Sequence, residues 1–131
     1  MTDLLEQGSA WLEDQRHAHM TRTVTYTRTI GVLGTFVTLA ATIGKTEFEQ
    51  ADDFGIVHRI QSRDYLVLAT DLVLGGEQSL PKAGDKIQET VGSTMFLYEV
   101  MAPGGEPPWR YSDPYRKTLR IHTKLVGTEE T

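Results

Sequence analysis

The sequence predicts a mainly β protein: a small β-barrel or sandwich of about seven or eight short antiparallel strands, with one N-terminal amphipathic helix. Apolar residues recur at helical spacing near the N-terminus, and most of the later chain alternates with a period of two. Turn-forming residues separate the strand candidates about every ten residues. At 131 residues, the chain is expected to form one domain, with a helix in residues 1–20, a barrel in 21–126 and a flexible tail in 127–131.

The helical pattern lies at the start of the chain. Leu4, Leu5, Trp11 and Leu12 fall on one face, and charged residues fall on the other. A stripe of this kind predicts a face that is buried on the barrel or on a neighbouring protein.

The strand pattern begins after residue 20. Between residues 21 and 30, threonines alternate with Val24, Tyr26 and Ile30, which is typical of a half-buried strand. Residues 31–44 continue the pattern, with glycines at both ends supplying turns. The further strand candidates are residues 46–50, 55–61, 64–69, 86–91, 95–101 and 118–126. The connections expected to be mobile are residues 44–55, 74–84 and 103–114.

Composition excludes several classes of protein. Hydrophobic residues make up 39% and charged residues 24% of the chain, as in soluble globular proteins. A net charge of −5 argues against general affinity for nucleic acid, which needs clustered Lys and Arg. The absence of cysteine excludes disulfides, thiol catalysis and Cys-based metal sites. The N-terminus does not read as a secretory signal and no apolar run is long enough to span a membrane, so we expect a soluble protein made in the cytoplasm.

The charges are unevenly distributed. Residues 109–124 carry five cations and one acid, a net of +4, so the rest of the chain carries −9. Opposite charges on one small domain favour head-to-tail contacts between copies.

No motif for catalysis or cofactor binding is present. The histidines, His17, His19, His58 and His122, lack ligand-like spacing and are interpreted as surface residues. No serine lies in a G-x-S-x-G turn, and the glycine pairs lack the continuation of a phosphate-binding loop. We therefore predict no enzyme, metal or cofactor; an enzyme with an unrecognised carboxylate or histidine site is a third hypothesis.

The segment before the C-terminus favours a protein interface. Residues 107–115 are interpreted as a proline-stiffened loop that presents three aromatic side chains, and residues 116–124 as a strand with one basic face. In that strand we expect Leu119, Ile121 and Leu125 to face inward and Arg120, His122 and Lys124 to face outward. Aromatic residues and Arg are enriched at protein interfaces. The alternative is single-strand nucleic-acid binding by a barrel of the OB type.

The predicted protein-interface residues are Leu4, Leu5, Trp11, Leu12, Trp109, Arg110, Tyr111, Tyr115, Arg116 and Arg120.

Four segments in order resemble a known family. They are RDYLVLATDLVL (63–74), LPKAGDKI (80–87), FLYEVMAP (96–103) and TLRIHTKLV (118–126). Across residues 20–126, this order resembles the head–tail joining proteins of tailed bacteriophages, also called head-completion, head-closure or stopper proteins.

The resemblance implies a non-enzymatic virion protein at the neck, assembled in the host cytoplasm. Members form a homo-oligomeric ring below the portal and adaptor proteins, and the tail or tail-terminator proteins dock on that ring. DNA passes through the channel without sequence-specific contact. In stopper-type members a loop enters the channel, and the candidate here is residues 44–55, with Glu47, Glu49, Asp52 and Asp53 as its acidic residues. Residues 74–84 are the other candidate, and a tail-terminator ring protein of the same neck region is the alternative function.

Overall fold

The computed structural model describes residues 21–130, and the predicted N-terminal helix lies outside them. The elements are β1 (Arg22–Ile30), β2 (Leu33–Ala51), β3 (Val57–Leu68), η1 (Ala69–Asp71), β4 (Val73–Leu74), β5 (Glu77–Gln78), β6 (Lys86–Val91), β7 (Thr94–Val100), η2 (Pro103–Gly105), β8 (Trp109–Tyr111) and β9 (Thr118–Glu130). The protein is therefore mainly β, as predicted, and η1 and η2 are single 3₁₀ turns. No helix within residues 21–130 is long and apolar enough to cross a membrane.

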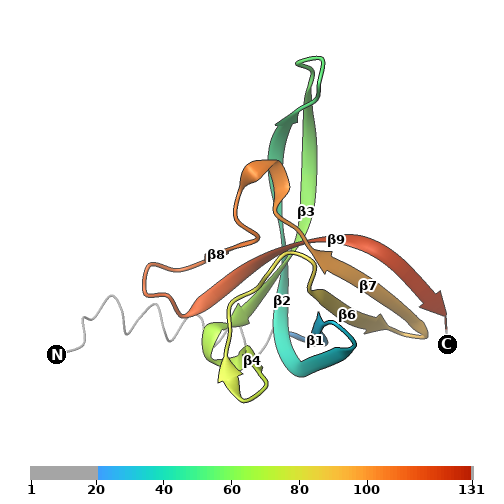
Figure 1. Ribbon diagram of the computed structural model, residues 1–131, viewed down its shortest axis with the longest axis vertical. Helices are drawn as coiled ribbons and strands as arrows, with labels where there is room; N and C mark the ends of the chain where they lie inside the picture. Colours follow the sequence, from blue (N-terminus) through green and yellow to red (C-terminus); the bar gives the residue numbers. More distant parts are fainter. Residues whose placement is uncertain (1–20, 131) are drawn as a thin grey trace.

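The main sheet is antiparallel, and its hydrogen bonding closes on itself. The strand order is β3–β2–β1–β6–β7–β9, and β9 pairs back with β3 (Figure 1). β8 adds to β9 on the side away from β3, while β4 and β5 form a separate small hairpin. Closure leaves few free strand edges in the body of the protein.

Three strands are much longer than the short strands that the sequence predicts. β2 joins two predicted strands into one of 19 residues, and β3 joins two others into one of 12. β9 has 13 residues because residues 127–130, expected to be a tail, continue it and pair with β7.

Gly44 explains why β2 continues where a turn is expected. A Cβ at this position would lie 3.1 Å from Nη1 of Arg120 and 3.2 Å from Cδ1 of Leu66. The glycine therefore permits close side-chain contact in a continuous strand, and it does not form a turn.

The core fills the interior of the closed sheet. Its side chains come from every strand of the ring and from the residues after β3, and Tyr26, Tyr65, Leu119 and Ile121 are fully buried. The alternating apolar residues of β1 and β9 point into this core.

Candidate assembly surfaces

The most prominent feature is a two-stranded arm, residues 46–62, formed by the outer parts of β2 and β3 (Figure 1). β3 pairs with β9 only from Arg63 onward. The residues of β3 that precede Arg63 pair only with β2. Six residue pairs, at about 3.3 Å each, extend the arm roughly 20 Å beyond the closed sheet. Residues 44–55 are therefore not the loop that the sequence predicts: residues 44–51 belong to strand β2, and residues 52–55 form the turn at the end of the arm.

The two faces of the arm differ in charge. Glu47 and Glu49 lie on one face and are exposed, with Arg59 directly opposite Glu49. Phe48 and Ile60 lie opposite each other on the second face and are half-buried. Including Asp52 and Asp53 at the turn, the arm has a net charge of −3.

Asp52 organises the turn at the arm's tip. Its Oδ1 accepts hydrogen bonds from the backbone N–H groups of Phe54 and Ile56, both at 2.9 Å. The ring Nε2 of His58 lies 3.0 Å from its Oδ2, and this contact, with the backbone N–H bonds, holds the pKa of Asp52 below its usual value. Gly55 supplies the positive φ of 79° that the turn requires.

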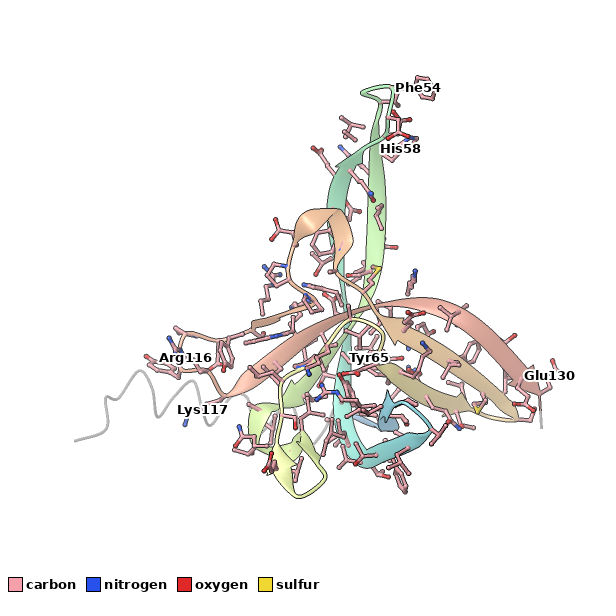
Figure 2. The ribbon with its side chains drawn as sticks, in the orientation of Figure 1. Phe54, His58, Tyr65, Arg116, Lys117 and Glu130 are labelled. Carbon is pink, nitrogen blue, oxygen red and sulfur yellow. The ribbon has the colours of Figure 1, made fainter. Side chains whose placement is uncertain are left out.

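The tip itself is apolar. Phe54 is 89% exposed, and Ile56 and Val57 are each 58% exposed. Figure 2 shows Phe54 at the end of the arm, with His58 just below it. Three exposed apolar side chains on a projecting turn are typical of a contact surface, although only the acidic residues of this segment are predicted as functional. The run FGIV after the two aspartates is the signal that could have found them.

A buried carboxylate fixes the base of the arm to the closed sheet. Asp64 is fully buried and accepts hydrogen bonds from the hydroxyls of Thr46 and Ser62. Arg120 Nη1 donates to its Oδ2 at 2.8 Å, and His122 Nδ1 lies 2.9 Å from its Oδ1. Burial alone would raise the pKa of Asp64, but these bonds together hold it well below its usual value.

A second buried carboxylate links β6 to β1 and β3. Glu89 accepts hydrogen bonds from Arg63 Nη2 at 2.8 Å, from Arg22 Nη1 at 2.8 Å and from the hydroxyl of Tyr65 at 2.7 Å. Burial opposes ionisation of Glu89, but the Arg63, Tyr65 and Arg22 bonds still lower its pKa. Both clusters are structural, because every partner belongs to a strand of the closed sheet.

Arg120 and His122 lie on the face of β9 opposite to the core residues Leu119 and Ile121, as predicted, but neither is free at the surface. Arg120 and His122 point to Asp64, and His122 is 3% exposed, so it is not a surface histidine. Of Arg120, His122 and Lys124, which are expected to face outward, Lys124 alone is exposed.

Leu125, predicted to face the interior, is not buried. The pairing of β9 with β7 changes register between Leu97 and Tyr98, where Leu125 is opposite Tyr98 and Gly127 is opposite Leu97. Leu125 lies opposite the core residue Tyr98, but it is 52% exposed and lies beyond Thr123, the last residue of β9 that pairs with β3.

The predicted aromatic loop contains strand β8. Trp109 and Tyr111 are half-buried against the core and pack edge-to-face on each other, with ring centroids 5.0 Å apart. Arg110, between them, is exposed. Tyr115 is half-buried in the turn that follows. These rings are therefore not fully displayed as stacking platforms for nucleic-acid bases.

The turn between β8 and β9 presents two cations. The Asp113 carboxylate is buried and accepts the backbone N–H groups of Tyr115, Lys117 and Thr118 at 2.8–3.1 Å. Arg116 adopts a φ of 60°, the one left-handed non-glycine residue in residues 21–130. Arg116 and Lys117 are both exposed, and Figure 2 shows them at one end of the body.

The second candidate channel segment, residues 74–84, is compact. Gly75 and Gly76, with positive φ, form the turn between β4 and β5, and Ser79 N–H donates to the carbonyl of Leu72. Arg28 Nη2 donates to the carbonyl of Leu80 at 2.6 Å. These bonds hold the segment against the body, whereas the arm projects.

The described residues also form a groove near the base of the arm. A groove of about 620 Å³ lies where β3 and β9 separate, lined by residues that include Lys45, Arg63, Tyr98 and Lys124. Within residues 21–130, no three His, Asp or Glu side chains lie close enough to form a metal site.

Together, these features define a small, mainly β protein with two projecting hairpins, one acidic with an apolar tip and one basic. Residues 2–130 match the family model of the phage head-tail joining protein. The chain belongs to that family, and it is a structural protein of the phage neck that contacts other head and tail proteins. A search of curated proteins finds no match.

Proposed function

We propose that this protein is a head-closure subunit that forms a ring below the portal and adaptor proteins, extends and closes the DNA channel there, and provides the surface on which the tail docks. The arm is the single observation that carries this proposal. It extends about 20 Å beyond the closed sheet, so a ring of subunits could direct many arms toward one axis.

The charged face of the arm suits a channel lining. Glu47 and Glu49, with Asp52 and Asp53 at the turn, repel the phosphates of DNA and disfavour adhesion during passage. Arg59, opposite Glu49, reduces this negative field in mid-arm but leaves the net charge negative.

The apolar tip suits closure. If the arms converge, Phe54, Ile56 and Val57 of neighbouring copies can bury one another and exclude water from the axis. In a single subunit these side chains are exposed to water. Contact between the tips of several arms would bury them, and this burial would stabilise the closed state. The hydrogen bonds to Asp52 hold the turn in one shape before any contact forms.

The structure favours this function over nucleic-acid binding by an OB-type barrel. Arg120 is engaged with Asp64, and Trp109 and Tyr111 pack on the core, so the residues proposed for stacking and phosphate contact are largely used within the fold. A tail-terminator ring would occupy a different level of the same neck.

The test uses phage particles assembled with the Phe54→Ser variant, and with Phe36→Ser as the matched control. Phe36 is also exposed, at 69%, but it lies on the β1–β2 hairpin. We expect both variants to enter the neck, and Phe54→Ser alone to let packaged DNA leak from heads before tails join. Normal DNA retention with Phe54→Ser in the ring would contradict the role of the tip, and neck density at the tail-terminator level would support the alternative.

A further inference from the structure

Strand β9 carries opposite charges at its two ends. Lys117 directly precedes its first residue, with Arg116 beside it, and Glu129 and Glu130 are the last residues of the strand. All four side chains are exposed. Figure 2 shows Arg116 and Lys117 on one side of the body and Glu130 on the opposite side.

The strand keeps these charges apart within one copy. Thirteen residues of strand extend roughly 40 Å at about 3.3 Å each. Pairing with β3, β8 and β7 along its length holds β9 in place. The basic and acidic ends therefore cannot neutralise each other in the same subunit, and over this distance salt screens their attraction.

The basic end is preorganised. Three backbone N–H groups bind Asp113, and Arg116 is held at a φ of 60°, a conformation that an arginine rarely adopts. The guanidinium carbon of Arg116 lies 5.9 Å from the centre of the Tyr111 ring, which supports it from one side. Neither Arg116 nor Lys117 forms an ion pair with a residue in the part of the chain described here. A strained turn whose exposed cations form no ion pair with the described residues favours a contact with a negatively charged surface.

We infer that the basic β8–β9 turn of one copy, with Arg110, Arg116 and Lys117, docks on the acidic β7–β9 end of a second copy, with Glu129 and Glu130. This contact joins two different surfaces, so it repeats head to tail and generates a ring where the rotation closes. The inference rests on the proposed ring and identifies the contact that joins its subunits. It leaves the arm free to reach the axis.

Zero-length carbodiimide cross-linking tests the contact directly, because it joins an amine to a carboxylate only where the two touch. A 1:1 mixture of ¹⁵N-labelled and unlabelled full-length protein, at high concentration and low salt, separates links between copies from links within one. We expect mixed-label peptides that join Lys117 to Glu129 or Glu130, with yields that fall on the order of tenfold at high salt.

Charge reversal supplies the second measurement. Lys117→Glu and the pair Glu129→Lys, Glu130→Lys should each weaken self-association on the order of tenfold in sedimentation, and all three changes in one chain should restore it. Lys124→Glu is the control, because Lys124 is exposed in the middle of β9. All these side chains are exposed, so thermal unfolding should change little.

Links from Lys117 chiefly to Glu47 or Glu49 of the arm, or failure of the combined variant to restore association, would overturn the contact. The two proposals fail in different ways. A ring in the neck that tolerates Lys117→Glu would refute this contact and leave the function intact. The expected cross-links in a protein missing from the neck would refute the function instead.

Discussion

Asp64 of β3 and His122 of β9 lie directly opposite each other in the strand pair that closes the sheet, with Asp64 Oδ1 and His122 Nδ1 2.9 Å apart. Both side chains are buried, and the same carboxylate binds Thr46 at the base of the arm. One group therefore links closure of the sheet to the position of the arm. A buried carboxylate is stabilising here only because its oxygens are fully bonded.

Replacing that carboxylate should destabilise the protein strongly. Asp64→Asn removes the charge that Arg120 and His122 bind, and we expect a loss of about 3 kcal/mol in the free energy of unfolding. Urea denaturation measures it. Asp53→Asn, on the exposed turn of the arm, should cost less than about 0.5 kcal/mol. Equal effects of the two changes would show that the buried cluster contributes no stability.

The buried carboxylates should make the protein sensitive to acid. The pKa values of Asp64 and Glu89 are lower in the folded protein than in the unfolded chain, where both are about 4. Their stabilising contribution is therefore complete above about pH 5, and it is lost as the pH falls below about 4 toward the folded pKa values. Urea titrations from pH 7 to pH 2 should show this decline, and Asp64→Asn should flatten it. An unchanged slope in that variant would mean that Asp64 does not drive the decline.

The hydroxyl of Tyr65 should matter more than that of Tyr98. Tyr65 donates to Glu89 at 2.7 Å and accepts from Arg63 Nε at 3.2 Å, so Tyr65→Phe should cost about 1–2 kcal/mol. Tyr98 packs edge-to-face on Tyr65, but its hydroxyl binds no residue in the described part of the chain, and Tyr98→Phe is the matched control. Thermal unfolding of the two variants compares them, and a smaller loss for Tyr65→Phe would contradict the account.

Arg116→Gly should separate strain from charge. Glycine accepts a φ of 60° without steric cost, so we expect the free energy of unfolding to rise by about 0.5 kcal/mol, despite the lost contact with Tyr111. Self-association should weaken in the same variant, because a cation is lost. A variant that is both less stable and equally associated would show that Arg116 serves the fold alone.

Local patterns predict part of this fold. The strand at residues 86–91 is predictable with its observed bounds, because turn residues flank an alternating segment. Distant partners decide the rest. Arg120 and His122 alternate as outward residues should, yet Asp64, more than fifty positions earlier, lies on the same face and binds both, so neither is free at the surface. No local pattern contains that partner.

The arm was predictable in position but not in form. The acidic residues of the segment 44–55 correctly indicate an exposed segment. Gly44 predicts a turn, but it lies inside strand β2, where the side chains of Arg120 and Leu66 leave little room for a Cβ atom. The basic strip is likewise divided by tertiary structure: Arg110, Arg116 and Lys117 stay exposed, whereas Arg120 becomes part of the buried cluster.

The proposal that arms from a ring of subunits close the channel can be tested with a density map of the neck in filled, tailless heads. We expect a closed ring of this protein below the portal and adaptor, with each arm pointing to the axis and the Phe54 side chains meeting there. A ring whose arms point outward or along its rim, with an open axis, would contradict it.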